Sequence, residues 1–450
     1  MCTLPNSKNL RCLDRFSILP DDAEGEDGLV HFWDVLITIL KEPVQSPQRA
    51  VEILDTISNC LRGSSGVAGD YGSSKSAIEE ASPTFFSTVW PCIVKAALAM
   101  PQLFPSGRME ILEPSSQTRL KLSRAQVRCL IAHQFLCTFQ APTWRDDYFD
   151  FSIWYDSAQR HPTAVGMYLA ALFSYFETSD RLTEHDDMVE YALHTTSIPG
   201  TVASQDESPL LNASALVLSE YSTEPQEFQY QGSQSAAVVS ANKDIGFGQS
   251  ATQEELYVGN CPEACPAVLV TPTLQGNQTL TITGARPMLR ILGQRRNISW
   301  ELLDSGLRRG GRMLFMDALE IDEIDEGDGM LPDLKPHNID RELQKAYSAF
   351  SSWPSGDGAT VWTGPWGCGA FNGDPGVKLC ILWMAASVAG KELRFLCDKS
   401  YEAFADSSNR FIESFDKGAT VGDLRARLLS IPKETKRLQT LQLLMGGDLV

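Results

Sequence analysis

The sequence predicts an α/β protein whose first half is mostly helical and whose second half alternates strands with helices. Apolar residues recur at three-to-four spacing through much of residues 27–177, which is the period of an amphipathic helix. After about residue 236, short runs rich in β-branched residues are separated by helix-like segments. That order is typical of a layered α/β domain with a parallel or mixed sheet.

The helical half has one sharp boundary signal, where Ser123 and Gln126 form an S-x-x-Q capping box. The Gly/Ser-rich stretch 63–83 predicts a flexible loop, and the polar residues 196–236 predict a connection between the halves. The expected division is an N-terminal segment 1–26, a helical accessory domain 27–195, the polar connection 196–236 and an α/β domain 237–450.

The second half carries the strand signals, each a short apolar run bounded by turn residues. The predicted strands are 236–242, 267–272, 278–284, 311–319, 359–364 and 392–398. The predicted helices are 341–350, 377–389 and 420–429, the last with Thr420 as its cap.

Charge and cysteine usage exclude several classes of protein. A formal charge of −19 argues against non-specific nucleic-acid binding, which depends on Lys and Arg. Cys261 and Cys265 are the only close cysteine pair and no His lies nearby, so free thiols are expected rather than a zinc site. The first thirty residues lack an apolar core and no long apolar run follows, which predicts an intracellular protein, in the nucleus and/or cytoplasm, without a membrane partner.

The stretch "WTGPWGCGAFNGD", residues 362–374, predicts a strand, a glycine-rich loop and a helix start, with Asp374 as N-cap and Pro375 at the first helical position. Such a turn lets backbone N–H groups approach an anionic ligand, so it indicates a phosphate or pyrophosphate cradle. Neither a Walker A lysine nor a G-x-G-x-x-G spacing is present. The alternative is a tight turn with Phe371 packed into the core.

A second stretch, "SANKDIGFGQSATQEEL", places Gly246 and Gly248 before Gln253, Glu254 and Glu255. In extended or turn backbone the adjacent carboxyl groups point different ways, so one can act as a general acid and the other can orient a hydroxyl. The alternative is a solvated helix start. The acidic run 316–329 lacks EF-hand spacing, so a solvated loop is expected after Leu319, and no metal site.

Together these motifs resemble the poly(ADP-ribose) glycohydrolase family. "TGPWGCGAFNGD" agrees with its T-G-x-W-G-C-G-A-F-x-G-D signature at every fixed position, and "NKDIGFGQSATQEE" is similar to its Gly-rich loop leading to Gln-Glu-Glu. The likeness extends over most of residues 80–430. It implies a macrodomain fold, a mixed sheet between helices, beside a helical accessory domain. It also implies poly(ADP-ribose) and ADP-ribosylated proteins as partners, ADP-ribose as product, and no cofactor or metal.

The resemblance also implies roles for individual residues. Glu255 would protonate the ribose–ribose glycosidic oxygen as it leaves, and Glu254 would hydrogen-bond the neighbouring ribose hydroxyls. Asn242 would help to hold the same ribose, and Gln253 would lie near the adenine. The remaining expected substrate-binding residues are Gly246 and Gly248 of the first loop, Gly367, Cys368, Gly369 and Ala370 around the pyrophosphate, and Phe371 against the terminal ribose.

The sequence departs from the family pattern at three places, and one is the stretch Val238-Val239-Ser240-Ala241 before Asn242, where the family usually has Val-Asp-Phe-Ala. Phe247 stands at the position of the middle glycine, and only four residues separate Gly248 from Gln253, fewer than in the family. The segment after Gly284 contains no tyrosine, whereas animal relatives have an adenine-facing tyrosine there. One alternative to a glycohydrolase is a macrodomain that binds ADP-ribose or its polymer without turnover. Another is a related ADP-ribosyl hydrolase acting on mono-ADP-ribosylated protein or a small metabolite.

Overall fold

The computed structural model describes residues 1–63, 69–116, 118–145, 148–178, 188–200, 205–217, 234–294, 297–324, 329–356 and 358–446. Its centre is an eight-stranded mixed sheet with the strand order β5-β6-β9-β12-β8-β13-β14-β7. These strands are β5 (Arg119–Ser123), β6 (Met188–His194), β7 (Ala213–Val217), β8 (Ser235–Ala241), β9 (Thr279–Thr283), β12 (Arg312–Asp317), β13 (Thr360–Thr363) and β14 (Glu392–Cys397). Neighbours from β12 to β7 pair in parallel, and β5, β6 and β9 are antiparallel to their neighbours.

The sheet lies between two apolar cores. Ala237 and Val239 of β8 point into the core shared with the N-terminal helices, and Ala236 and Val238 point into the opposite core. Because successive side chains of a strand alternate between faces, a strand covered on both sides must be apolar at nearly every position. This explains why residues 236–239 read as a continuous apolar run.

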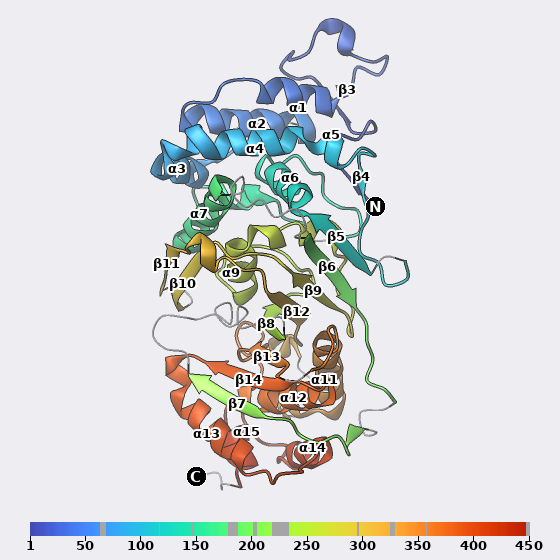
Figure 1. Cartoon of the computed structure of the whole chain (residues 1–450), viewed down its shortest axis with the longest axis vertical. Coiled ribbons are helices and arrows are strands. Elements are labelled where there is room, and N and C mark those ends of the chain that lie inside the picture. The colour runs from blue at the N-terminus through green and yellow to red at the C-terminus, as the bar shows by residue number, and fades with distance from the viewer. Residues whose placement is uncertain are drawn as a thin grey trace.

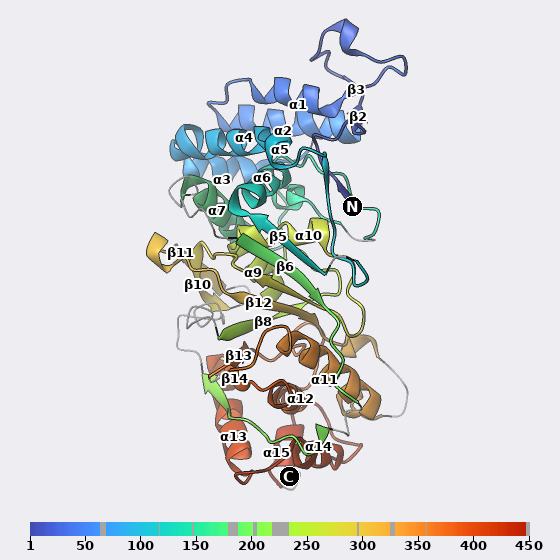
Figure 2. The ribbon, with the colours of Figure 1, turned by 45° about the vertical axis from the view of Figure 1, so that its right-hand side comes forward.

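The helices of the N-terminal half stack above the sheet in Figures 1 and 2. They are α1 (Phe32–Leu40), α2 (Pro47–Arg62), α3 (Gly72–Ala81), α4 (Trp90–Leu98), α5 (Met100–Leu103), α6 (Arg124–Phe135) and α7 (Pro162–Thr178). The predicted capping box at Ser123 and Gln126 is confirmed. None of the helices in the described ranges is both long and apolar enough to cross a bilayer.

The later helices cover the sheet and its far edge. They are α9 (Gln253–Asn260), α10 (Ala267–Val270), α11 (Pro336–Phe350), α12 (Pro375–Val388), α13 (Glu402–Glu413), α14 (Val421–Leu429) and α15 (Thr440–Leu444). The caps predicted at Asp374 and Thr420 are confirmed, since each side chain accepts a hydrogen bond from a backbone N–H of its own first turn. α11 and α12 pack side by side in the core opposite the N-terminal helices.

Two local predictions are wrong. The loop expected at 63–83 contains helix α3, because Ile78 and Ser74 are buried where this helix packs against α2 and α7; residues 64–68 lie outside the described part. The strand expected at 267–272 is instead the short helix α10. Its residues are buried on all sides, so an apolar run of this length fits a buried helix turn as well as a strand.

The sheet also takes strands from segments in which none was expected. β5 and β6 lie within the predicted helical domain, and β7 lies within the predicted polar connection. β5 shows the alternating burial of a half-covered strand. Within the described ranges, β7 pairs with β14 alone and ends the sheet. The hairpin of β10 (Leu289–Gln294) and β11 (Asn297–Leu302) was not predicted either. Four two-residue strands, β1 (Cys2–Thr3), β2 (Arg11–Cys12), β3 (Val30–His31) and β4 (Arg108–Met109), pair outside the main sheet.

Candidate active site

A pocket of about 990 Å³ lies where the loops after β8 and β13 meet. These strands are parallel neighbours, so both loops leave the same edge of the sheet, and that edge is where ligands bind in α/β folds. The pocket is lined by all the residues singled out from the sequence: Asn242, Gly246, Gly248, Gln253, Glu254, Glu255, Gly367, Cys368, Gly369, Ala370 and Phe371. The fold thus brings two motifs together that are more than one hundred residues apart.

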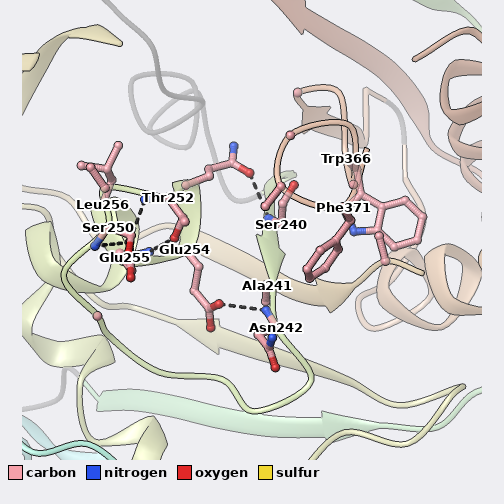
Figure 3. A pocket seen from close by; sticks show the side chains of 18 of the residues that line it. Ser240, Ala241, Asn242, Ser250, Thr252, Glu254, Glu255, Leu256, Trp366 and Phe371 are labelled. Atoms are coloured by element: carbon pink, nitrogen blue, oxygen red, sulfur yellow. Dashed lines mark hydrogen bonds between the residues drawn. The ribbon is translucent and has the colours of Figure 1, made fainter. Parts of the chain in front are cut away.

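Glu254 joins the end of β8 to the loop that follows it. Its side chain is buried, and its Oε2 accepts a hydrogen bond from the Asn242 N–H at 2.8 Å while its Oε1 accepts one from the Gly246 N–H at 2.9 Å. Figure 3 shows the carboxyl group reaching toward the end of the strand. Burial raises the pKa of Glu254 to about 8, although the two backbone N–H groups lower it, with smaller effects from Glu255 and Arg145.

The raised pKa of Glu254 predicts a pH-dependent stability. The folded chain keeps this proton up to about pH 8, whereas an unfolded glutamate loses it near pH 4.5. The stabilising contribution is therefore complete below the unfolded value and falls by up to about 1.4 kcal/mol per pH unit as the pH rises toward the folded value. In urea unfolding between about pH 5 and about pH 8, we expect wild type to lose stability relative to Glu254→Gln, which cannot ionise. A pH-independent difference between the two proteins would contradict the expectation.

Glu255 lies in the first turn of α9, not in the extended or turn backbone expected from the sequence. Thr252 is the N-cap, and Glu255 completes a capping box in which its Oε2 accepts from the Thr252 N–H at 2.8 Å. The same Glu255 oxygen also accepts from the Ser250 N–H at 2.9 Å. Its Oε1 lies against Gly248, where an added Cβ would be only 2.0 Å away. Gly248 is therefore required for the carboxyl group to occupy this place.

Gln253, the first residue of α9, is hydrogen-bonded to strand β8. Its Oε1 accepts a hydrogen bond from the Ser240 N–H at 2.9 Å, so Gln253 and Glu254 both fix α9 to the end of β8. In Figure 3, Glu254 and Glu255 stand on one side of this strand end, and Trp366 and Phe371 stand on the other.

The glycine-rich loop offers backbone donors to the pocket. Gly369 and Ala370 are exposed on the pocket wall, and within the described part of the chain their N–H groups donate no backbone hydrogen bond. The N-terminus of α12 is less open to a ligand than expected, because the Asp374 side chain already accepts from the Val377 N–H at 2.9 Å. Phe371 is half-buried and packs against the core that contains the buried residues of α12. Its side chain is therefore neither fully exposed to a ligand nor fully buried in the core, the two arrangements that the sequence left open.

A buried cation lies beneath this loop. The Lys378 ammonium is inaccessible to solvent, contacts the Glu342 carboxylate, and lies 3.6 Å from Asp333 Oδ1. An added Cβ on Gly373 would lie 2.9 Å from Lys378 Cε, and one on Gly367 would lie 3.5 Å from it. Gly373 therefore lets the loop fold closely over a charged side chain, whereas the distance from Gly367 is an ordinary van der Waals contact.

Several residues of the pocket were missed by the sequence argument. Arg437 donates from Nε to the Gly373 carbonyl at 3.0 Å and from Nη2 to the Cys368 carbonyl at 3.1 Å, which fastens the loop to the C-terminal segment. The other missed lining residues include Arg145, Phe149, His161 and Tyr401. They come from segments distant in sequence and carry no local motif, so only the fold reveals them. Among the described residues, no cluster of three or more His, Cys, Asp or Glu side chains is arranged to hold a metal ion.

Two family models match this chain, and both describe the same family. A family model described as poly(ADP-ribose) glycohydrolase, macro domain fold, matches residues 211–404, and one described as the helical domain of the same family matches residues 78–192. The chain is 30% identical over 201 residues to poly(ADP-ribose) glycohydrolase 1 of Caenorhabditis elegans, covering 41% of this chain and 26% of that protein. It is 28% identical over 173 residues to poly(ADP-ribose) glycohydrolase 2 of the same organism, covering 34% and 35%.

A solved structure of poly(ADP-ribose) glycohydrolase from Deinococcus radiodurans in complex with ADP-ribose is 18% identical and covers 53% of this chain and 94% of that chain, with a TM-score of 0.31. That similarity is too low to place individual residues. The matched segments span well under half the length of the curated relatives. The two family models together cover more than half of the chain, and they confirm the expected macrodomain fold and helical domain.

Proposed function

Because the chain belongs to the poly(ADP-ribose) glycohydrolase family, we propose that it hydrolyses the ribose–ribose O-glycosidic bonds of poly(ADP-ribose) and releases ADP-ribose. The observation that carries this proposal is the meeting of two carboxyl groups and a glycine-rich loop in one pocket. Cleavage of a glycosidic bond needs a proton for the leaving oxygen and stabilisation of an oxocarbenium-like centre, which is then attacked by water. Relatives carry the same activity in their names.

Glu255 is the proposed general acid. Its Oε2 is held by two backbone N–H groups, so a proton on this carboxyl group resides on Oε1, the oxygen beside Gly248. Glu254 is proposed to bind the ribose hydroxyls, with Asn242 beside it. One observation favours the reverse assignment, since burial raises the pKa of Glu254 to about 8 and an acid must be protonated at the working pH.

The other residues are proposed to hold the terminal ADP-ribose. The N–H groups of Gly369 and Ala370 would donate to phosphate oxygens, as in other backbone anion sites, with Gly367 and Cys368 completing the loop. Phe371 would pack against the terminal ribose and Gln253 would lie near the adenine. The first loop, with Gly246 and Gly248, would line the ribose pocket next to the carboxyl groups.

The partners and location follow as further parts of the proposal. Poly(ADP-ribose) and ADP-ribosylated proteins are the proposed partners, without direct nucleic-acid binding. All eleven cysteines are free thiols, which supports a reducing compartment, the nucleus and/or cytoplasm.

The test is to incubate the purified protein with poly(ADP-ribose) on an automodified polymerase and to quantify free ADP-ribose. A binding assay with ADP-ribose runs in parallel. Release of ADP-ribose at many turnovers per protein would support the glycohydrolase. A folded protein that binds ADP-ribose but releases none would exclude turnover and leave the alternative, a macrodomain that only binds the polymer.

A further inference from the structure

The loop that leads to the two glutamates is packed into the helical half of the protein. Phe247, at its centre, is buried. Its ring centroid lies 4.9 Å from that of Phe151 and 5.1 Å from that of Trp154. Both partners belong to a short 3₁₀ turn, Phe151–Trp154. Trp154 in turn lies 5.2 Å from Tyr168 of α7, so these four side chains form one aromatic cluster (Phe151, Trp154, Tyr168 and Phe247).

Trp154 also makes a polar contact with the backbone of the loop that leads to the glutamates. Its indole Nε1 donates a hydrogen bond to the Gly248 carbonyl at 2.8 Å. Trp154 is almost fully buried, at 1% exposure, so it holds one orientation and the Gly248 carbonyl is held with it. This hydrogen bond is part-buried, so water only partly compensates the Gly248 carbonyl when its donor is lost.

The position of Gly248 bears directly on Glu255. The glycine leaves so little space that a Cβ would be 2.0 Å from Glu255 Oε1, and two residues later the Ser250 N–H donates to Glu255 Oε2. Movement of the Gly248 peptide therefore moves the carboxyl group or breaks its hydrogen bonds. Misplacement of a catalytic group by about 1 Å can lower a rate about a hundredfold.

We propose that Trp154 is a positioning residue for Glu255: the helical half fixes the acidic side chain through the Gly248 carbonyl, with Phe247 anchoring the shortened loop. The effect on turnover rests on the proposed function, whereas the effect on the carboxyl group's hydrogen bonds does not. The helical half is then part of the active-site machinery.

The neighbouring residue supplies a matched control. Tyr155 is also fully buried, and its hydroxyl also donates to a backbone carbonyl, that of Phe135, at 2.6 Å. That carbonyl belongs to the end of α6, away from the loop. Trp154→Phe and Tyr155→Phe therefore each remove one hydrogen-bond donor from a buried aromatic side chain. Only Trp154→Phe removes a hydrogen bond to the loop that leads to the glutamates.

The experiment measures hydrogen exchange of the Ser250 and Thr252 amides together with kcat, KM and the unfolding midpoint. These amides donate to Glu255 Oε2, so their protection reports the carboxyl group's position without any activity. We expect Trp154→Phe to exchange at least about tenfold faster at both amides and to lower kcat by about tenfold to a hundredfold, with KM and ADP-ribose affinity little changed. Tyr155→Phe should also lower stability, through the loss of a buried hydrogen bond, while keeping kcat and the protection of both amides.

Unchanged protection in Trp154→Phe, or equal losses in both variants, would overturn the positioning role. If wild type shows no turnover but Trp154→Phe alone loses amide protection, the proposed function fails and the positioning role stands. If Trp154→Phe does not fold, Phe247→Leu replaces it in the same experiment. This variant keeps an apolar side chain but removes the ring contacts, and it is compared with Tyr155→Phe by the same criteria.

Discussion

Glu255→Gln is expected to lower kcat for release of ADP-ribose from poly(ADP-ribose) by a hundredfold or more, the size expected when a general acid is removed. The glutamine carbonyl oxygen can still accept from the Ser250 and Thr252 N–H groups, which now bond to Oε2. The capping box and the helix start therefore persist, and KM should change little. What the amide lacks is a proton acidic enough to transfer to the leaving ribosyl oxygen.

Glu254→Gln is the comparison that separates the two carboxyl groups. Both Glu254 oxygens accept backbone N–H groups, from Asn242 and Gly246, so an amide NH₂ placed there must face one of these donors. We expect a loss of ADP-ribose affinity and a smaller loss of kcat. Glu80→Gln, at an exposed position of α3, controls for the substitution itself.

The opposite result would reassign the acid. If Glu255→Gln keeps more than about a tenth of the wild-type kcat while Glu254→Gln loses the activity, then Glu254 donates the proton. In that case the rate should fall as the pH rises through about 8, where its carboxyl group ionises. The same two variants and one pH series therefore decide between the assignments.

Local signals in the sequence predicted the framework of the site. Asp374 and Pro375 mark the start of α12 because a cap and a first-turn proline act within a few residues. The strands that lead into both loops, β8 and β13, were predicted because they are covered on both faces and therefore read as apolar runs. The glycines of the two loops then indicated where the backbone comes close to other groups.

What was missed depends on contacts between distant segments. β7 is short and lies at the edge of the sheet, so its pattern does not stand out from the polar residues around it. Trp154 and Arg437 are each more than sixty positions away in the sequence from their hydrogen-bond partners, which are Gly248 and Gly373 respectively. No local sequence motif predicts such a contact. Phe247 was singled out only as a departure from the family pattern, and its aromatic partners were not predicted.

Lys378→Met is expected to lower the free energy of unfolding by about 3–5 kcal/mol, the usual cost of leaving buried charges without their partner. Lys378, Glu342 and Asp333 are each at most 2% exposed in their side chains. Burial already raises the pKa of Asp333 to about 6 against the attraction of Lys378. Methionine fills a similar volume but leaves Asp333 without the cation beside it, while Glu342 keeps its ion pair with Arg341.

A second buried lysine provides the control for Lys378→Met. The Lys391 ammonium lies 4.6 Å from the centre of the Trp353 ring, much as that of Lys378 lies 4.8 Å from the Trp366 ring. Its hydrogen-bond partners, however, are two backbone carbonyls and a hydroxyl. Lys391→Met therefore leaves neutral acceptors unpaired, and we expect a smaller loss of about 1–3 kcal/mol.

The pH dependence distinguishes charge from packing as the cause of the Lys378→Met loss. Without the ammonium, which lowers the pKa of the buried Asp333 carboxyl group, that pKa rises further, so the folded variant holds a proton that the unfolded chain releases. Its deficit relative to wild type should be smallest at acidic pH and should grow as the pH rises toward neutrality. Urea unfolding of wild type, Lys378→Met and Lys391→Met across this range makes the measurement. A stability deficit of Lys378→Met that does not depend on pH, or equal losses in the two variants, would contradict the role of charge. The Lys378 side chain would then stabilise the protein only by filling space under the glycine-rich loop.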